Sequence, residues 1–327
     1  MRAIVQRTYG SPTRVLTLDE LPTPVPGEGE VRVRVHASSV NKGDWFAVTG
    51  RPWLVRPAFG LLRPRDPTPG RDVAGVVEEV GPGVKGLARG DEVVGELNQR
   101  AWAELACAPA STLAVKPPDV SFEDAATLPV AAITALQGLR DHGHLAAGET
   151  VLVNGASGNV GTFAVQIAKA LGATVTAVCS TRNVETAAAL GADHVVDYTT
   201  TDFTDTEARY DLVFDIAASR PLAACRRLLA PTGRYVLCSG DLGRLARVAV
   251  ASMGNRSIVG PWVANTDPDD LAILMAWIVE GRIDPVIERT VGLENVAEAV
   301  RDQGEGHGRG KTVVRIGAPE GGDRDGP

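Results

Sequence analysis

The chain has 327 residues, of which 44% are hydrophobic and 22% are charged, a composition typical of a globular protein and not of a fibrous or disordered one. Its net charge of −7 argues against a nucleic-acid groove or an anionic membrane surface as the main partner. The N-terminus lacks an apolar signal core, and no stretch is apolar for long enough to span a membrane, so we expect a cytoplasmic protein.

Short strands are predicted throughout the first third of the chain. Proline and glycine separate runs in which apolar and polar residues alternate, as in V-R-V-R-V at residues 31–35. The predicted strands are Arg2–Arg7, Val15–Glu20, Glu30–Ala37, Val73–Val80, Glu92–Gly95 and Trp102–Ala106. Their alternation and turn spacing predict a compact, partly closed β-barrel.

The composition changes at Ser121. This serine is a predicted helix N-cap, because Glu123 and Asp124 follow in the first turn and an alanine-rich run extends to Leu139. Helical segments then alternate with strands, which are predicted at Val151–Val153, Val175–Val178, His194–Val196, Tyr210–Asp215, Gly233–Ser239 and Ser257–Gly260. This alternation predicts a doubly wound parallel sheet of the α/β class.

The stretch from Thr150 to Arg182 has the pattern of a dinucleotide-binding unit, with a strand, a glycine turn, an amphipathic helix and a second strand. The first turn of such a helix has free backbone N–H groups that can bind an anion. The predicted contacts are Ala156, Ser157, Gly158, Asn159, Val160 and Gly161, with alanine where the fingerprint usually has its first glycine. A tight glycine turn without a ligand would show the same spacing.

The residues that end the second strand of this unit indicate which dinucleotide binds. An acid there would accept hydrogen bonds from the ribose 2′-OH of NAD, but Cys179 is followed by Ser180, Thr181 and Arg182. Two hydroxyl groups and a guanidinium suit a 2′-phosphate, so we predict NADP(H). The alternative is that Arg182 is a solvated surface residue and Ser180 a helix N-cap.

The remaining elements are predicted to return to the first domain. They are a helix at Asp269–Glu280, a strand at Val286–Val291, a helix at Leu293–Arg301 and a strand at Lys311–Ile316. We therefore predict a barrel domain in residues 1–122, a Rossmann NADP-binding domain in 123–263, a returning segment of the first domain in 264–317 and a disordered tail in 318–327.

Several motifs together carry a resemblance to a known family. They are S-S-V-N-K-G-D-W (38–45), G-R-D-V-A-G-V-V-E-E-V-G-P-G-V (70–84), G-D-E-V-V-G (90–95), N-G-A-S-G-N-V-G (154–161), L-G-A-D-H-V-V-D-Y (190–198) and G-R-G-K-T-V-V (308–314). The chain resembles the zinc-free branch of the medium-chain dehydrogenases/reductases, which includes quinone oxidoreductases and enone reductases. The resemblance implies a GroES-like catalytic barrel built from both ends of the chain, and a homodimer formed through the edge strand near Ser257–Gly260.

Departures from the zinc-dependent relatives favour chemistry without a metal. Those enzymes have a cysteine where this chain has Asn41–Asp44, a G-H-E motif where it has Gly70–Asp72, and a four-cysteine lobe. The four cysteines here are Cys107, Cys179, Cys225 and Cys238, and none forms a C-x-x-C pair. We therefore expect hydride transfer from the nicotinamide to a quinone or to the β-carbon of an enal or enone.

The resemblance also implies roles for individual residues near the reacting atoms. Asn41, Lys42 and Asp44 are catalytic candidates, because a donor must stabilise the charge that develops on the carbonyl oxygen. Related reductases often have tyrosine at the position of Phe46, and phenylalanine has no proton to give. The proton would then come from water, or with help from Asp44. Asn41 and Lys42 would also suit a purely structural role in the loop.

Further cofactor and substrate contacts follow by position in the family. Those for the cofactor are Thr134 at the nicotinamide end, Tyr198 near the adenosine phosphate, Ser239 and Gly240 at the nicotinamide ribose, and Lys311 with Gly310 from the returning segment. Those for an apolar substrate are Trp45, Phe46, Trp53 and Trp262. Packing, capping or solvated roles remain alternatives for these residues.

Three functions stay open at this stage. The first is an NADPH-dependent quinone or enone reductase. The second is an enzyme of the same fold that tailors a polyketide-like intermediate in a biosynthetic pathway. The third is a catalytically idle nucleotide-binding relative.

Overall fold

A computed structural model describes residues 1–306 and 308–317, so the predicted tail at 318–327 lies outside the described residues. The chain divides into two compact units. Unit 1 consists of Met1–Pro129 and the later segments 289–306 and 312–317, whereas unit 2 consists of Val130–Glu288 and Gly308–Lys311. Each unit has its own sheet, and none of the described helices has the length and apolarity needed to cross a membrane.

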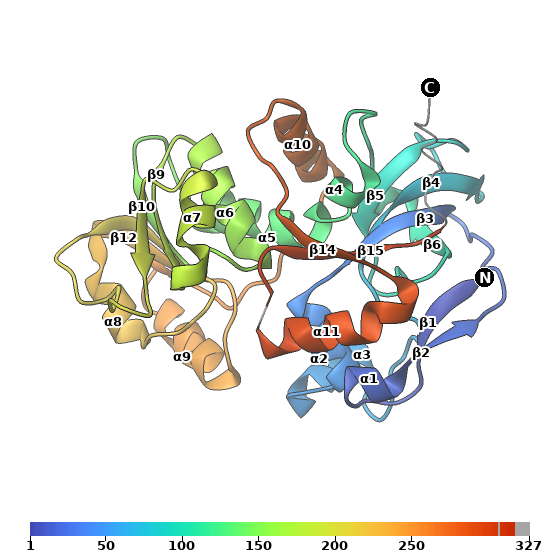
Figure 1. Cartoon of the computed structure of the whole chain (residues 1–327), viewed down its shortest axis with the longest axis horizontal. Helices are drawn as coiled ribbons and strands as arrows, with labels where there is room; N and C mark the ends of the chain where they lie inside the picture. The colour runs from blue at the N-terminus through green and yellow to red at the C-terminus, as the bar shows by residue number, and fades with distance from the viewer. Residues whose placement is uncertain (307, 318–327) are drawn as a thin grey trace, which may run out of the picture. The chain divides into compact units, whose positions relative to one another are not determined.

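Unit 2 is built on a parallel sheet of six strands (Figure 1). The strands are β8 (Thr150–Asn154), β9 (Thr174–Cys179), β10 (His194–Asp197), β11 (Tyr210–Asp215), β12 (Leu229–Leu237) and β13 (Ile258–Val259), in the spatial order β10-β9-β8-β11-β12-β13. The order reverses direction beside β8, which creates the switch point where dinucleotides bind in such sheets. The predicted doubly wound sheet is confirmed, and β13 is an edge strand.

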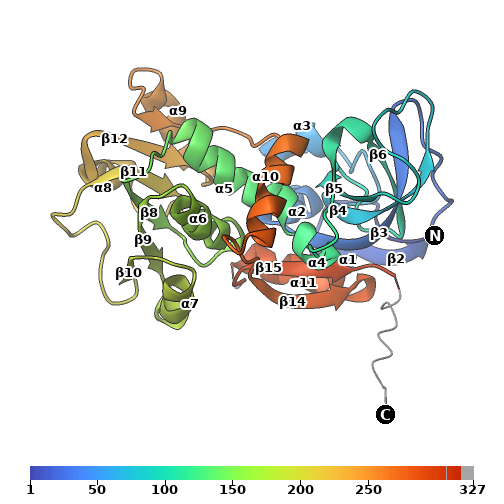
Figure 2. The same cartoon turned by 90° about the horizontal axis from the view of Figure 1, so that it is seen from above.

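Helices cover this sheet because their apolar stripes match its faces. The strands are contacted by α6 (Asn159–Ala170), α7 (Val184–Ala189), α8 (Leu222–Arg227) and α9 (Leu242–Ser252), and unit 2 also contains α10 (Pro268–Val279). Figure 2 shows α6 along β8 and β9, where Phe163, Ala164 and Ile167 are fully buried. This burial places the N-terminus of α6 at the carboxyl edge of the sheet.

The helix predicted from Ser121 to Leu139 is broken into shorter pieces. Ser121 does cap a short helix, α4 (Phe122–Ala125), by accepting a 3.0 Å hydrogen bond from the Asp124 N–H. A wider turn at Leu128–Ala132 then precedes α5 (Ile133–Gln137). The prediction of one continuous helix was wrong, because a turn at residues 126–127 interrupts it, and Pro129, which has no N–H, lies in the first turn of the piece that follows.

Unit 1 contains the predicted barrel. Its larger sheet has the order β14 (Ile287–Gly292), β15 (Lys311–Arg315), β3 (Glu30–Val40), β4 (Asp72–Val80), β5 (Glu92–Glu96) and β7 (Leu113–Val115), and β6 (Leu105–Pro109) also pairs with β3. Strands β1 (Arg2–Gln6) and β2 (Leu16–Glu20) form a separate pair. Strand β3 pairs with β6 along its first half and with β15 along its second half, so the sheet curls around the apolar side chains of Val31, Val33 and Val35.

Short helices complete unit 1. They are α1 (Pro12–Val15), α2 (Lys42–Thr49), α3 (Arg56–Phe59) and α11 (Val296–Glu305), with a 3₁₀ turn at Trp53–Val55. Figure 1 shows α11 beside α2 and α1, against which it packs. The contact brings the C-terminal part of the chain onto its N-terminal part, as the predicted returning segment requires.

The unit boundaries lie after Pro129 and after Glu288, whereas the sequence suggested boundaries at 122/123 and 263/264. The main difference is α10, which was expected in the returning segment and belongs to unit 2. Its Asp270 is 6% exposed and accepts hydrogen bonds from Gln137 (2.9 Å) and Arg140 (2.6 Å). These buried polar contacts attach α10 to the segment around α5.

Gly70 should be intolerant of any side chain. Its φ of +97° is strained for other residues, and an added Cβ would lie 2.6 Å from the Trp102 ring. Gly90 has the same φ of +97° but open space around it, so it is a matched control. We expect Gly90→Ala to lower the free energy of unfolding by about 1–2 kcal/mol and Gly70→Ala by at least about 2 kcal/mol more, measured by urea denaturation. Equal losses would show that the Trp102 contact is unimportant.

Candidate cofactor and active site

The turn from β8 into α6 is the place where the sequence predicts an anion site. Strand β8 ends at Asn154, Gly155 adopts a φ of +94°, and α6 begins after Gly158. The Gly155 and Ala156 N–H groups donate to the Val178 carbonyl of β9, at 3.2 and 3.1 Å, which holds the loop against the sheet. The first-turn N–H groups of α6 therefore stand at the carboxyl edge of the sheet, where a phosphate would be bound.

The two later glycines of this loop have different environments. A Cβ at Gly161 would overlap the Gly155 carbonyl, so this glycine permits the close packing of helix on strand. At Gly158 the backbone is extended with φ of −84°, and a Cβ would meet only the Gly155 carbonyl oxygen at 3.7 Å. Within the described residues no contact requires glycine at 158, which is the N-cap of α6, so the predicted close approach of a ligand at this position stays a prediction.

The predicted adenosine-side residues lie at the end of β9. The Ser180 hydroxyl accepts a 3.1 Å hydrogen bond from Asn183, and Thr181 donates a 2.6 Å hydrogen bond to Asp197. Arg182 is exposed, and its guanidinium has no hydrogen bond or ion pair within residues 1–306 and 308–317. Tyr198 follows β10 and is 50% exposed. These side chains are gathered at one edge of the sheet.

Asp197 is a residue that the sequence analysis missed at this edge. No acid ends β9, but Asp197 ends the parallel neighbour β10 and pairs in register with Cys179. The hydrogen bond from Thr181 holds the pKa of Asp197 below its usual value, so the carboxylate is charged at neutral pH. The signal was present in the sequence, because two adjacent parallel strands were predicted to end there.

A buried polar network connects the strands at the switch point of the sheet. Asp215 is fully buried at the end of β11 and accepts hydrogen bonds from Asn154 (2.7 Å), Tyr235 (2.7 Å) and Arg244 (2.8 Å). Arg244, on α9, is 6% exposed and also donates to the Tyr235 hydroxyl at 3.0 Å. One carboxylate therefore joins the ends of β8, β11 and β12 to α9. Its fully desolvated charge requires these donors.

Other predicted cofactor residues lie in unit 2 with structural partners of their own. Thr134 donates to the Val130 carbonyl at 2.6 Å, and Ser239 donates to the Ile216 carbonyl at 2.8 Å, just before Gly240. The Gly310 N–H donates to the Ser157 carbonyl at 3.0 Å, so the segment before Lys311 touches the glycine loop, and its predicted contact with the cofactor stays a prediction. Lys311 is fully buried, which removes the alternative that it is a solvated lysine.

The catalytic candidates lie in unit 1, in a buried polar cluster where β3 meets α2. The Asn41 side-chain amide donates to Asp72 Oδ2 at 2.7 Å, and Ser39 donates to the same oxygen. The Asn41 backbone N–H donates to Asp44 Oδ2 at 2.7 Å. Asn41, Asp44 and Asp72 are at most 2% exposed. The structure thus gives Asn41 a fixed orientation and gives Asp44 a role at the start of α2.

Lys42 and the four aromatic candidates for the substrate pocket lie in different environments. Lys42 Nζ donates to the carbonyls of Gln303 and Gly304 at the end of α11, where a cation complements the helix dipole, and burial lowers its pKa. The rings of Trp45 and Phe46 are 5.3 Å apart, edge to face. Trp53 is 67% exposed, so it is not a core residue. In unit 2, the Trp262 and His142 rings lie 4.3 Å apart in a tilted arrangement.

The chain matches two family models, an alcohol dehydrogenase GroES-like domain at residues 27–119 and a zinc-binding dehydrogenase at residues 190–314. It is 33% identical over 330 residues to a chloroplast envelope quinone oxidoreductase homolog of Arabidopsis thaliana, covering 96% of this chain and 98% of that one. It is 32% identical over 328 residues to the NADPH-dependent alkenal/one oxidoreductase of A. thaliana, covering 96% and 79%.

Among solved structures, the quinone oxidoreductase from Coxiella burnetii is similar, with a TM-score of 0.87, 29% identity and coverage of 97% of this chain and 99% of that one. The chain belongs to the medium-chain dehydrogenase/reductase family. Its similar relatives include quinone oxidoreductases and an alkenal/one oxidoreductase, and the protein is an oxidoreductase. The fold of a Rossmann sheet with a GroES-like barrel is that of the family.

Zinc-dependent members of the medium-chain dehydrogenase/reductase family need cysteine and histidine ligands, and this chain has other residues there. Asp72 stands in the G-R-D segment and accepts from Ser39 and Asn41, while Arg71 forms an ion pair with Glu96. Within residues 1–306 and 308–317, no group of three or more His, Cys, Asp or Glu side chains is arranged to hold a metal ion. The absence of zinc from the reaction stays a prediction.

The two loop glycines should respond differently to the same substitution. Gly161→Ala must push the Gly155 carbonyl aside, so we expect it to lower the melting temperature by several degrees. Gly158→Ala fits the protein and should leave the melting temperature nearly unchanged, while it weakens NADPH binding by at least about tenfold because the methyl group faces the pyrophosphate. Calorimetry and isothermal titration measure both. Unchanged NADPH affinity in Gly158→Ala would contradict the assignment of the loop.

Proposed function

We propose that the protein is an NADPH-dependent reductase that transfers a hydride, without a metal, to a quinone or to the β-carbon of an α,β-unsaturated carbonyl compound. The observation that carries this proposal is the open N-terminus of α6 at the switch point of the parallel sheet, with the unpaired Arg182 at the end of the adjacent strand. The named activities of the quinone oxidoreductase and alkenal/one oxidoreductase relatives support it.

The choice of NADPH over NADH depends on opposing charges. Arg182 offers an unneutralised guanidinium, and Ser180 offers a hydroxyl, to a 2′-phosphate. Asp197 lies at the same edge and would repel that phosphate, but Thr181 and Thr199 already donate to both of its oxygens, at 2.6 and 2.7 Å. We infer that the exposed, unpaired cation of Arg182 outweighs the Asp197 carboxylate, which these hydroxyl groups hold in place. The preference for NADPH is then moderate.

The bound dinucleotide would supply the hydride, and the protein would place and polarise the acceptor. In this proposal the Asn41 amide, whose orientation Asp72 fixes, donates to the carbonyl oxygen on which negative charge develops. Asp44 holds the Asn41 backbone, whereas the Lys42 ammonium is bound to carbonyls at the end of α11 and would act on the substrate only as a more distant positive charge. Phe46 has no exchangeable proton, so water protonates the product carbon.

The substrate should be apolar and without a charge of its own at the reacting end. Trp45, Phe46, Trp53 and Trp262 are the proposed aromatic contacts, and the exposed indole of Trp53 is available to a ligand. A homodimer formed through β13 remains a prediction, supported by the position of β13 at the edge of the sheet. A cytoplasmic location also remains a prediction.

The proposed reaction can be measured by the loss of NADPH absorbance with a panel of quinones, enals and enones. We expect turnover with at least one class, and we expect the rate to stay the same after dialysis against a chelator, because the region of Asn41 and Asp72 lacks the usual zinc ligands. Metal analysis of the purified protein is the control. Stoichiometric zinc together with activity that a chelator abolishes would contradict the metal-free mechanism, and NADPH binding without turnover would contradict the proposed activity.

Arg182 and Asp197 should move the coenzyme preference in opposite directions. Arg182→Ala removes the cation and should weaken NADPH binding by about tenfold or more with little effect on NADH. Asp197→Asn keeps the shape but removes the negative charge, and should tighten NADPH binding severalfold while NADH is nearly unaffected. Titration calorimetry with both coenzymes gives the ratios. Equal losses of NADPH and NADH affinity in Arg182→Ala would remove the argument for the 2′-phosphate.

A further inference from the structure

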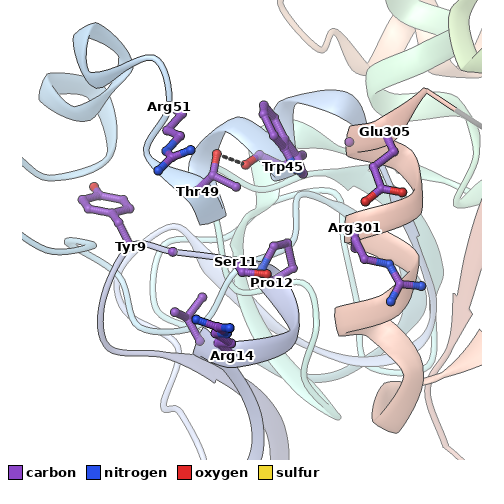
Figure 3. A pocket seen from close by; sticks show the side chains of 12 residues that line it. Tyr9, Ser11, Pro12, Arg14, Trp45, Thr49, Arg51, Arg301 and Glu305 are labelled. Atoms are coloured by element: carbon purple, nitrogen blue, oxygen red, sulfur yellow. Dashed lines mark hydrogen bonds between the residues drawn. The ribbon is translucent and has the colours of Figure 1, made fainter.

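A separate cavity lies within unit 1, where α1, α2 and α11 meet (Figure 3). It has a volume of about 560 Å³, which is in the range of small-molecule sites. All of its lining residues belong to unit 1, whereas the glycine loop belongs to unit 2. Trp45, a proposed substrate contact, also lines this cavity, but no role assigned to the carboxyl edge of the unit 2 sheet accounts for it.

The cavity has a surplus of positive charge in a chain whose net charge is −7. Arg14 on α1 and Arg51 after α2 line it, and neither side chain has a hydrogen bond or an ion pair within the described part of the chain. Arg301 on α11 lines the opposite side, and it shares the carboxylate of Asp302 (2.7 Å) with Arg289 (2.8 Å). Because the single negative charge of Asp302 is shared by Arg289 and Arg301, these three side chains together keep a net positive charge.

Further arginines stand beside the same cavity around Tyr9. Arg56 lies 4.8 Å from the centre of the Tyr9 ring, and the positive charge of Arg65 also acts on the Tyr9 hydroxyl. Tyr9 itself stays neutral, because burial raises its pKa and its hydroxyl donates to the Gly60 carbonyl at 2.5 Å. The acid that faces these cations from the lining is Glu305, at the end of α11. It faces them from the side of Arg301, as Figure 3 shows.

The rest of the lining is largely apolar, with the hydroxyl groups of Ser11 and Thr49 as polar exceptions. Trp45 presents its indole from α2, and Pro12 and Val15 contribute aliphatic surface from α1. A ligand that fills such a cavity would place an anionic group among the guanidinium groups of the lining and a planar body against Trp45. The guanidinium groups suit carboxylate or phosphate oxygens, which they can bind through paired hydrogen bonds.

We propose that this cavity binds a small organic anion, a carboxylate or phosphate carried on a planar apolar body, with Arg14 and Arg51 as the anion-binding residues. The site is distinct from the dinucleotide site, because all of its residues lie in unit 1. The proposal does not depend on the identity of the coenzyme or on catalytic activity.

The test is isothermal titration with sodium benzoate, an aromatic carboxylate, and with inorganic phosphate, an anion without an apolar body. Neutral benzamide is the matched probe without the charge. We expect wild-type protein to bind benzoate in the millimolar range and benzamide at least about tenfold more weakly. Phosphate that binds as tightly as benzoate would show that the anion provides the affinity and would identify phosphorylated ligands as the class. Weaker phosphate binding would identify aromatic carboxylates.

Substitutions then locate the binding. Arg14→Ala and Arg51→Ala should each weaken benzoate binding by about tenfold, and the double substitution should remove it. Arg89→Ala, which removes an exposed arginine elsewhere in unit 1, and Arg182→Ala, at the edge of unit 2, should leave it unchanged. Circular dichroism confirms that the variants fold. The proposal is overturned if wild-type protein binds neither anion, if benzamide binds as well as benzoate, or if benzoate affinity falls in Arg182→Ala and not in Arg14→Ala or Arg51→Ala.

Discussion

The arrangement of unit 2 depends on the close packing of α6 against the end of β8. Gly161 allows this contact, because any side chain there would displace the Gly155 carbonyl. The contact aims the first-turn N–H groups of α6 at the carboxyl edge of the sheet. Every other feature of the nucleotide edge is positioned relative to that helix end: the segment Ser180–Arg182 after β9, Asp197 after β10 and the Gly310 contact to Ser157.

The buried Asp215 network gives the same edge its rigidity. A charge without solvent is tolerated only when donors surround it, and here the donors come from β8, β12 and α9. The strands therefore cannot shift independently of one another. Unit 1 uses the same principle on a smaller scale, because the buried carboxylate of Asp72 fixes the Asn41 amide and the Ser39 hydroxyl where β3 meets α2.

Much of the fold could be predicted because it depends on local patterns. The alternation at residues 31–35 indicated β3, and the run of strand, glycine turn and helix indicated β8 and α6. Features that depend on contacts distant in sequence were harder. Asp197 reaches the end of β9 only through the parallel register of β10, and Arg244 meets Asp215 only once α9 is folded.

The residues at the candidate site show the same limit. The sequence identified Asn41, Lys42 and Asp44 as candidates. It did not show that Asp72 would accept a hydrogen bond from Asn41, or that Lys42 would reach the end of α11. The burial of Lys311 and the exposure of Trp53 are likewise properties of the packed structure, and residue type alone suggests the reverse for both. The break in the helix after Ser121 is different, because it lies at residues 126–127, and the sequence does show a boundary signal there in the nearby Pro129.

The account rests on the claim that the N-terminus of α6 binds a phosphorylated nicotinamide dinucleotide. A crystal structure of the protein soaked with NADPH tests this claim most directly. The account predicts the pyrophosphate over Gly158, the 2′-phosphate beside Arg182 and no metal ion at the nicotinamide ring. An empty glycine loop at saturating NADPH, or a divalent ion bound beside the ring, would contradict it.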